Sequence, residues 1–122
     1  SAGGSVNTVR TGTFGMVPAE AATALALVLT ELVTNAVEHG LAGVRGGTVE
    51  IVAERTGPHL RAVVADDGVG LPDGGGPMTG LGTQIVGTLV RNELRGTIDW
   101  LPREGGGTQV VLDVDLQERK SL

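Results

Sequence analysis

The sequence of 122 residues contains no cysteine and a single lysine, Lys120, close to its end. Without cysteine, neither a disulfide nor a thiolate metal site can form. Without a lysine in its body, the chain has no Walker A loop, because the lysine of that loop reaches the terminal phosphates of a nucleotide. Any bound phosphate would have to be neutralised differently, by a divalent cation and the N-terminus of a helix.

Long apolar runs and clusters of basic residues are also missing. The most apolar stretch, residues 19–37, is interrupted by polar side chains and therefore does not predict a membrane-spanning helix. The first residues lack a basic region followed by an apolar one, so we expect no signal peptide. The net charge is −5 and the basic residues are scattered, which argues against a nucleic-acid surface. These absences predict a soluble, cytoplasmic domain that contacts neither nucleic acid nor membrane.

The remaining composition is that of a folded domain, with 40% hydrophobic and 19% charged residues. The length fits one domain with a core of its own. We expect residues 1–5 to be disordered or foreign to the domain, residues 6–116 to form it, and residues 117–122 to be a tail.

Hydrophobic periodicity predicts five strands and two helices. The strands are expected at residues 6–13, 48–54, 60–65, 96–101 and 108–116, and the helices at 18–39 and 81–94. Gly40 is the expected stop of the first helix. The order β-α-β-β-loop-α-β-β favours an α/β (α+β) two-layer sandwich, in which helices cover one face of a mainly antiparallel mixed sheet.

Three polar side chains gather near the end of the first helix. On a helical projection Glu31, Asn35 and Glu38 fall within about 60° of one another, opposite the apolar side. Asn35 offers a neutral oxygen that suits Mg²⁺, and Glu31 could orient or deprotonate a nucleophile. The alternative, a solvated helix face, stays open on the helix alone. For His39 we predict a role in capping or in contacting phosphate, not in accepting a phosphoryl group.

A long loop without periodicity, residues 66–79, contains five glycines and two prolines. Loops of this length inside a small domain are usually functional. It opens with Asp66-Asp67-Gly68-Val69-Gly70, directly after a strand. A carboxylate held there can accept a hydrogen bond from an exocyclic amine such as that of adenine, and the glycines allow a ligand to approach closely. The alternative is an ordinary turn with solvated aspartates.

The second predicted helix starts with Gly80-Leu81-Gly82-Thr83. The free amides at a helix N-terminus form a natural phosphate site, and glycines let the phosphates come near. The alternative is an ordinary helix entry. The dinucleotide fingerprint fits poorly, because no strand directly precedes Gly80 and the third glycine is missing.

In this order, Glu31-x-x-x-Asn35, Asp66-x-Gly68-x-Gly70, Gly80-x-Gly82 and Gly107-Thr108 resemble the ATP-binding boxes of the GHKL superfamily, which has the Bergerat fold. That superfamily includes histidine kinases, anti-sigma-factor kinases, gyrase, Hsp90 and MutL. More narrowly, residues 24–40 and 80–86 resemble the catalytic domain of sensor histidine kinases of the HisKA_2/HWE type. Within that type, these segments resemble the PdtaS-like kinases, which signal to RNA-binding ANTAR response regulators.

This resemblance implies ATP and Mg²⁺ as ligands and a role for each box. Asn35 would coordinate Mg²⁺, Glu31 would act as general base, and Asp66 would bind the adenine amine. The implied nucleotide contacts further comprise Gly68, Gly70 and Thr108 around the base, Gly80, Leu81, Gly82 and Thr83 beside the phosphates, and residues 71–79 as the ATP lid. The chain departs from many kinases at Glu38, where they have a lysine, so that phosphate contact is lost or passes to His39 or an arginine. The lid is also short and has no phenylalanine.

The implied reaction is transfer of the ATP γ-phosphoryl group to a histidine on a separate dimerisation domain, followed by signalling to a response regulator. Too little sequence precedes the first helix to contain that domain, so we expect nucleotide binding but weak kinase activity from this chain alone. One rival is a serine kinase that binds and inhibits a sigma factor. Another is an inactive nucleotide sensor that only switches partners, although the presence of both Glu31 and Asn35 argues against it.

Overall fold

The computed structural model of the chain describes residues 6–40, 46–68 and 81–117, apart from the side chains of His39 and Leu81. Its elements, in chain order, are β1 (Asn7–Gly12), α1 (Ala19–Asn35), the π-helical turn η1 (Ala36–Gly40), β2 (Thr48–Thr56), β3 (His59–Asp66), α2 (Leu81–Asn92), β4 (Thr97–Pro102) and β5 (Thr108–Asp115). The predicted order of strands and helices is confirmed, with bounds shifted by one to two residues at most ends.

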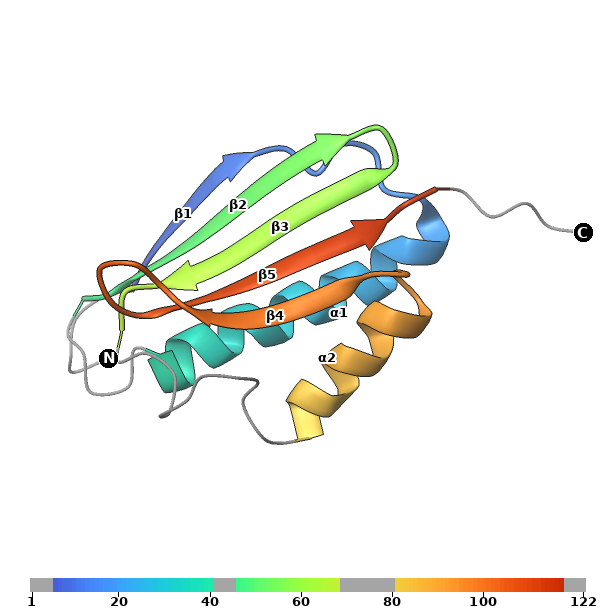
Figure 1. The fold of residues 1–122 in the computed structure, drawn as a ribbon. Helices are drawn as coiled ribbons and strands as arrows, with labels where there is room; N and C mark the ends of the chain where they lie inside the picture. The colour runs from blue at the N-terminus through green and yellow to red at the C-terminus, as the bar shows by residue number, and fades with distance from the viewer. Residues whose placement is uncertain (1–5, 41–45, 69–80, 118–122) are drawn as a thin grey trace, which may run out of the picture.

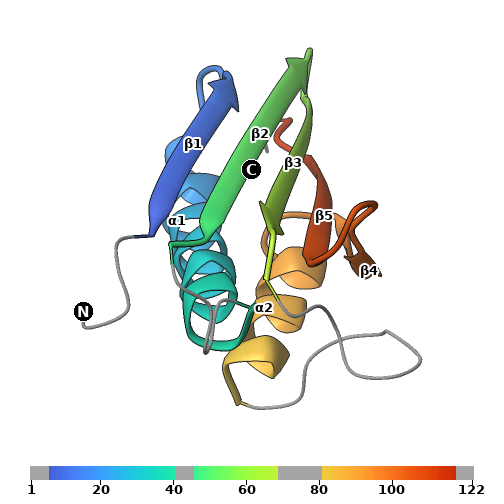
Figure 2. The ribbon, with the colours of Figure 1, turned by 90° about the vertical axis from the view of Figure 1, so that its left-hand side faces the viewer.

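The five strands form one sheet in the order β1-β2-β3-β5-β4. β1 runs parallel to β2, and the other neighbours are antiparallel. Both helices lie on the same side of the sheet, as Figure 1 and the turned view in Figure 2 show. The predicted two-layer sandwich with a mainly antiparallel mixed sheet is therefore confirmed, and no helix of the described residues lies over the second face of the sheet, which we call the uncovered face.

The core lies between the sheet and the helices. Alternate strand residues such as Val49, Leu60 and Leu112 point toward the helices and are fully buried, because side chains along a strand alternate between its faces. Val28 and Leu32 of α1 meet them at helical spacing. Phe14 and Trp100 pack against this core and stay partly exposed.

The first helix departs from its prediction at two points. α1 ends as an α-helix at Asn35 and continues as a wider π-helical turn to Gly40, so the projection that placed Glu38 beside Asn35 does not hold past Asn35. Single π turns inside helices are frequent at functional sites. The segment Ala19–Glu38 also has the length and composition to cross a membrane, contrary to expectation. Its buried residues, such as Val28 and Leu32, are part of the core against the sheet.

Candidate functional site

Four segments meet at one end of the sheet. They are the end of β3, the turn before β5, the end of α1 with η1, and the first turn of α2 (Figure 1). η1 packs against β3, and α1 packs against α2. The boxes found in the sequence therefore lie on neighbouring elements, although the chain separates them by tens of residues.

Asp66 is the last residue of β3 and is 4% exposed. It continues the row of β3 side chains that faces the helices, and its Oδ1 accepts a hydrogen bond from the Gly68 N–H at 2.9 Å. Burial raises the pKa of this carboxyl group above its ordinary value, and the negative charge of Asp67 acts in the same direction. Hydrogen bonds from the amides of Gly68 and Thr108 and the positive charge of Arg103 oppose the rise. A buried carboxylate of this kind is well suited to accept a further hydrogen bond from a ligand amine.

Thr108 lies directly opposite Asp66 in the antiparallel pair of β3 and β5, and it is buried as well. The residue before it, Gly107, has a φ of +97°, and a Cβ atom added there would collide with the carbonyl oxygen of Asp66. Only glycine combines that backbone conformation with so close an approach. Gly107 thus brings the start of β5 against the end of β3 and places Thr108 next to the carboxylate.

The neighbouring Asp67 has a structural role. Its Oδ1 accepts a hydrogen bond from the Thr48 N–H at 2.8 Å, and its own N–H donates to the Thr48 carbonyl oxygen at 3.3 Å. Asp67 therefore ties the end of β3 to the start of β2. Asp66 was the predicted ligand contact of these two adjacent carboxylates, and in the structure Asp67 is the one that bonds to the backbone of Thr48.

Glu31 and Gly82 contact each other across the two helices. A Cβ atom added to Gly82 would lie 2.6 Å from Oε2 and 2.9 Å from Oε1 of Glu31. The carboxylate of Glu31 is half-buried and sits over the first turn of α2. That first turn carries free amides and the positive end of the helix dipole, which attract anions. The geometry puts a potential base beside a potential phosphate site.

Asn35 ends α1 just before the π turn. Its side-chain nitrogen is buried and has no hydrogen-bond partner among the described residues. An amide nitrogen left unpaired in this way costs stability, and such an arrangement is common at sites that serve function rather than folding. Within residues 6–40, 46–68 and 81–117, no three acidic, histidine or cysteine side chains converge to hold a metal. The residues present fit Mg²⁺ only as an ion that takes most of its ligands from phosphate and water, with Asn35 supplying a neutral oxygen.

The other predicted contacts divide into three groups. Thr83 is half-buried in the first turn of α2, and Leu81 begins that helix. Glu38 is exposed in η1, and the backbone of His39 lies in the same turn. Gly70, Gly80 and the expected lid, residues 71–79, lie outside the described residues.

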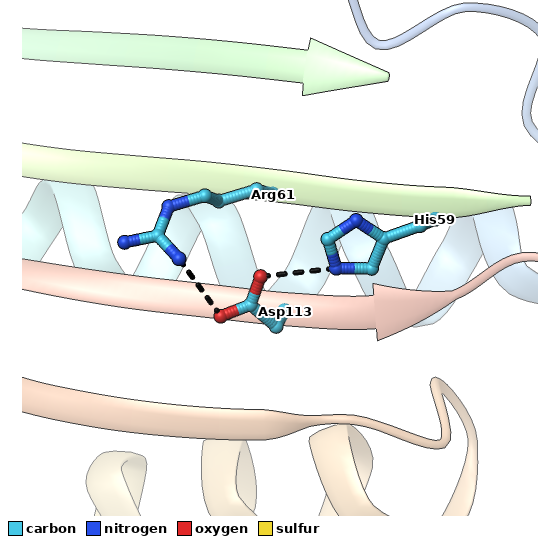
Figure 3. Close-up of polar contacts among 3 residues, drawn as sticks. All are labelled: His59, Arg61 and Asp113. Atoms are coloured by element: carbon cyan, nitrogen blue, oxygen red, sulfur yellow. Dashed lines mark hydrogen bonds and ion pairs between the residues drawn. The ribbon is translucent and has the colours of Figure 1, made fainter. Parts of the chain in front are cut away.

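A second polar cluster lies on the uncovered face of the sheet (Figure 3). Asp113 of β5 bonds to His59 Nε2 at 3.0 Å and to Arg61 Nη1 at 3.4 Å. His59 is exposed, and its partner lies 54 positions away in the chain, so this pair could not be seen from the sequence. His59 and Asp66 stand at opposite ends of β3, roughly 23 Å apart at about 3.3 Å per residue, so this cluster does not belong to the site.

Comparison with known proteins shows the family to which the chain belongs. The family described as histidine kinase-, DNA gyrase B-, and HSP90-like ATPase matches residues 20–118. The chain belongs to this family. It is a histidine kinase ATPase domain, and its relatives are sensor histidine kinases.

Among these relatives, the sensor histidine kinase PdtaS of Mycolicibacterium smegmatis is 47% identical over 113 residues, which is 90% of this chain and 23% of the relative. PdtaS of Mycobacterium tuberculosis is 44% identical over 116 residues, 93% of this chain and 23% of the relative. The chain thus spans about a quarter of the length of these curated relatives. The solved histidine kinase domain of an Erythrobacter litoralis blue-light-activated histidine kinase superposes with a TM-score of 0.78 at 29% identity, covering 91% of this chain and 55% of that one.

Proposed function

We propose that residues 6–116 form the ATP-binding catalytic domain of a cytoplasmic sensor histidine kinase. In this proposal the domain transfers the γ-phosphoryl group of ATP to a histidine on a separate dimerisation domain. The observation that carries the proposal is Asp66, a carboxylate that is 4% exposed, lies at the end of a central strand and is bordered by Gly107 and Thr108. No cation among the described residues forms an ion pair with Asp66. A buried carboxylate of this kind is costly, and a ligand amine would offset that cost.

The proposed mechanism begins with binding of the adenine ring. Asp66 accepts a hydrogen bond from the 6-amino group of adenine, and the buried Thr108 next to it supports the base through its hydroxyl or a bridging water. By the family resemblance, Gly68 and Gly70 would shape the wall of the pocket. Because Asp66 is fixed by the amide of Gly68, the adenine position is set before the phosphates are engaged.

The phosphates are then placed at the first turn of α2, beside Gly80, Leu81, Gly82 and Thr83, where amides and the helix dipole stabilise their charge. When bound, Mg²⁺ supplies neutralisation of the phosphate oxygens, and Asn35 is the residue that would hold it. Glu31, which lies over Gly82, is the residue that would orient or deprotonate the attacking histidine. Phosphoryl transfer needs mainly such positioning and charge stabilisation. Residues 71–79 would close over the nucleotide, and His39 or an arginine would contact phosphate where other kinases use a lysine in place of Glu38.

The partners follow from the reaction. The acceptor histidine belongs to the dimerisation domain, and a response regulator, of the ANTAR type by the resemblance to PdtaS-like kinases, receives the phosphoryl group. One solved relative in fold is the histidine kinase ThkA in complex with the response regulator TrrA, with a TM-score of 0.72 at 24% identity, covering 92% of this chain and 34% of that one.

Calorimetric titration of ADP and of ATP with Mg²⁺ tests the pocket. We expect the unaltered chain to bind both, and Asp66→Asn to weaken both by about tenfold or more, because a charge-assisted hydrogen bond to the base is lost. Asp113→Asn is the matched control, since it removes a carboxylate from the uncovered face of the sheet. Equal affinities for the unaltered chain and Asp66→Asn would exclude the adenine assignment, and no binding of ADP by the unaltered chain would exclude the nucleotide site altogether.

A further inference from the structure

The turn between β4 and β5, residues 103–107, lies at the same end of the sheet as Asp66. The Arg103 N–H donates to the Gly107 carbonyl oxygen at 3.0 Å, and the Gly106 N–H donates to the Arg103 carbonyl oxygen at 3.0 Å. These two hydrogen bonds close the turn on itself. Since Gly107 packs directly on the carbonyl oxygen of Asp66, the position of the turn and the position of Asp66 depend on each other.

The side chain of Arg103 connects this turn to a distant strand. Its Nη2 lies 3.6 Å from Oε1 of Glu50 in β2, and the two side chains are 31% and 36% exposed. In the sheet order, β3 and β5 stand between β2 and β4, so the ion pair links the β4–β5 hairpin to a strand that it does not adjoin. A half-exposed pair of this kind contributes little to stability. Its loss would thus leave the sheet folded, and the effect to test is a change in the position of the turn.

Arg103 also acts on Asp66 through its charge. Among the described residues, the charged groups that influence Asp66 are Asp67, next to it in the chain, and Arg103 from the β4–β5 turn. The positive charge of Arg103 lowers the pKa of Asp66, while burial and Asp67 raise it. Loss of this cation would leave the carboxylate both less firmly placed and more easily protonated.

We propose that Arg103 is a positioning residue for purine recognition. Its pair with Glu50 holds the 103–107 turn over the end of β3, so that Gly107 and Thr108 keep the Asp66 carboxylate aimed at the amino group of the base. This inference rests on the proposed nucleotide site and extends it to base specificity. A guanine nucleotide presents a carbonyl oxygen at the same ring position and is rejected because two acceptors then face each other.

The first experiment compares ADP and GDP binding to the unaltered chain, Arg103→Gln, Arg103→Lys and the control Arg61→Gln between pH 5 and pH 8. Arg61 is also paired with a carboxylate on the uncovered face, but it lies near the opposite end of β3. We expect Arg103→Gln to weaken ADP binding by about threefold to tenfold and to narrow the preference for ADP over GDP. ADP affinity is lost as the pH is lowered, and in Arg103→Gln this loss should begin at a higher pH. Arg103→Lys should keep most of the ADP affinity, the preference for ADP and the pH dependence of the unaltered chain, and Arg61→Gln should change none of the three.

The second experiment needs no nucleotide. The amide NMR signals of Gly68 and Thr108 are followed through a pH titration, because both amides donate to Asp66. In Arg103→Gln the midpoint moves to higher pH, and in Arg61→Gln it stays in place. An unchanged midpoint in Arg103→Gln overturns the proposal, as does unchanged ADP affinity and selectivity. If the unaltered chain fails to bind ADP, the proposed nucleotide function fails, and the NMR midpoint alone decides whether Arg103 acts on Asp66.

Discussion

The contact between Glu31 and Gly82 leads to a substitution that separates catalysis from stability, Gly82→Ala. The new methyl group would lie 2.6 Å from one carboxylate oxygen, whereas ordinary contacts of a Cβ atom begin at 3.4 Å. The carboxylate must therefore move by about 0.8 Å, the difference between these distances. Because it is the far end of a flexible side chain, it can move at little cost in folding free energy.

The two consequences have opposite signs. Alanine is a better helix former than glycine by up to about 1 kcal/mol, so the free energy of unfolding should stay the same or rise. A displacement of a catalytic group by about 1 Å can cost roughly 10²-fold in rate. We therefore expect Gly82→Ala to melt at or above the temperature of the unaltered chain while phosphoryl transfer falls by about two orders of magnitude.

The assay is transfer of radiolabelled phosphate from ATP to a histidine-containing phosphoacceptor domain supplied in trans, together with urea unfolding. Gly87→Ala is the matched control, since it lies in the same helix and its added Cβ would meet only the end of the Arg91 side chain, at 3.1 Å or more. It should gain similar stability and keep its transfer rate. A Gly82→Ala protein with the unaltered transfer rate would refute the idea that the position of Glu31 over α2 matters.

Three further predictions concern the buried polar groups. Asn35→Leu removes an amide nitrogen that is buried without a partner among the described residues, so the free energy of unfolding in urea should not fall and should rise by up to about 1 kcal/mol. The ATP affinity of Asn35→Leu should no longer respond to Mg²⁺. A fall in its free energy of unfolding by more than about 2 kcal/mol would instead indicate a structural role for Asn35. Gly107→Ala, at φ +97° and in collision with Asp66, should lower the free energy of unfolding by more than about 2 kcal/mol and abolish ADP binding. Gly105→Ala is the control for backbone strain alone, because Gly105 has a φ of +86° and no atom lies within 4 Å of its added Cβ. If both variants lost the same free energy of unfolding, the contact between Gly107 and Asp66 would not explain the effect. For Asp66, burial raises the pKa of the carboxyl group in the folded state, so the folded protein binds more protons than the unfolded one. The free energy of unfolding therefore falls as the pH rises from below the ordinary value of about 4 through the raised pKa. Asp66→Asn has no carboxyl group to titrate, so its free energy of unfolding in urea, relative to that of the unaltered chain, should grow over this pH range. The nucleotide affinity of the unaltered chain should rise over the same range as Asp66 becomes ionised. A stability difference that stays constant with pH would contradict the assignment.

The sequence alone determined the order of the elements and predicted which residues carry the chemistry of the candidate site. Period-two and helical patterns depend on which faces are buried, so they located the five strands and both helices. Glu31, Asn35 and Asp66 could be singled out because they stand in polar or glycine-rich positions next to apolar elements. The order of these segments also indicated the ATPase family to which the chain belongs.

The tertiary structure decided which of these residues meet and which do not. Glu31 contacts Gly82, Asp67 holds Thr48, Arg103 pairs with Glu50, and Asp113 pairs with both His59 and Arg61. Each contact joins positions far apart in the chain, and it depends on strand register and on the packing of α1 against α2, which local patterns do not encode. The π turn after Asn35 likewise arises where α1 packs on β3. Local periodicity therefore specified the parts, and long-range packing specified that Asp66, not Asp67, is the buried carboxylate of the site.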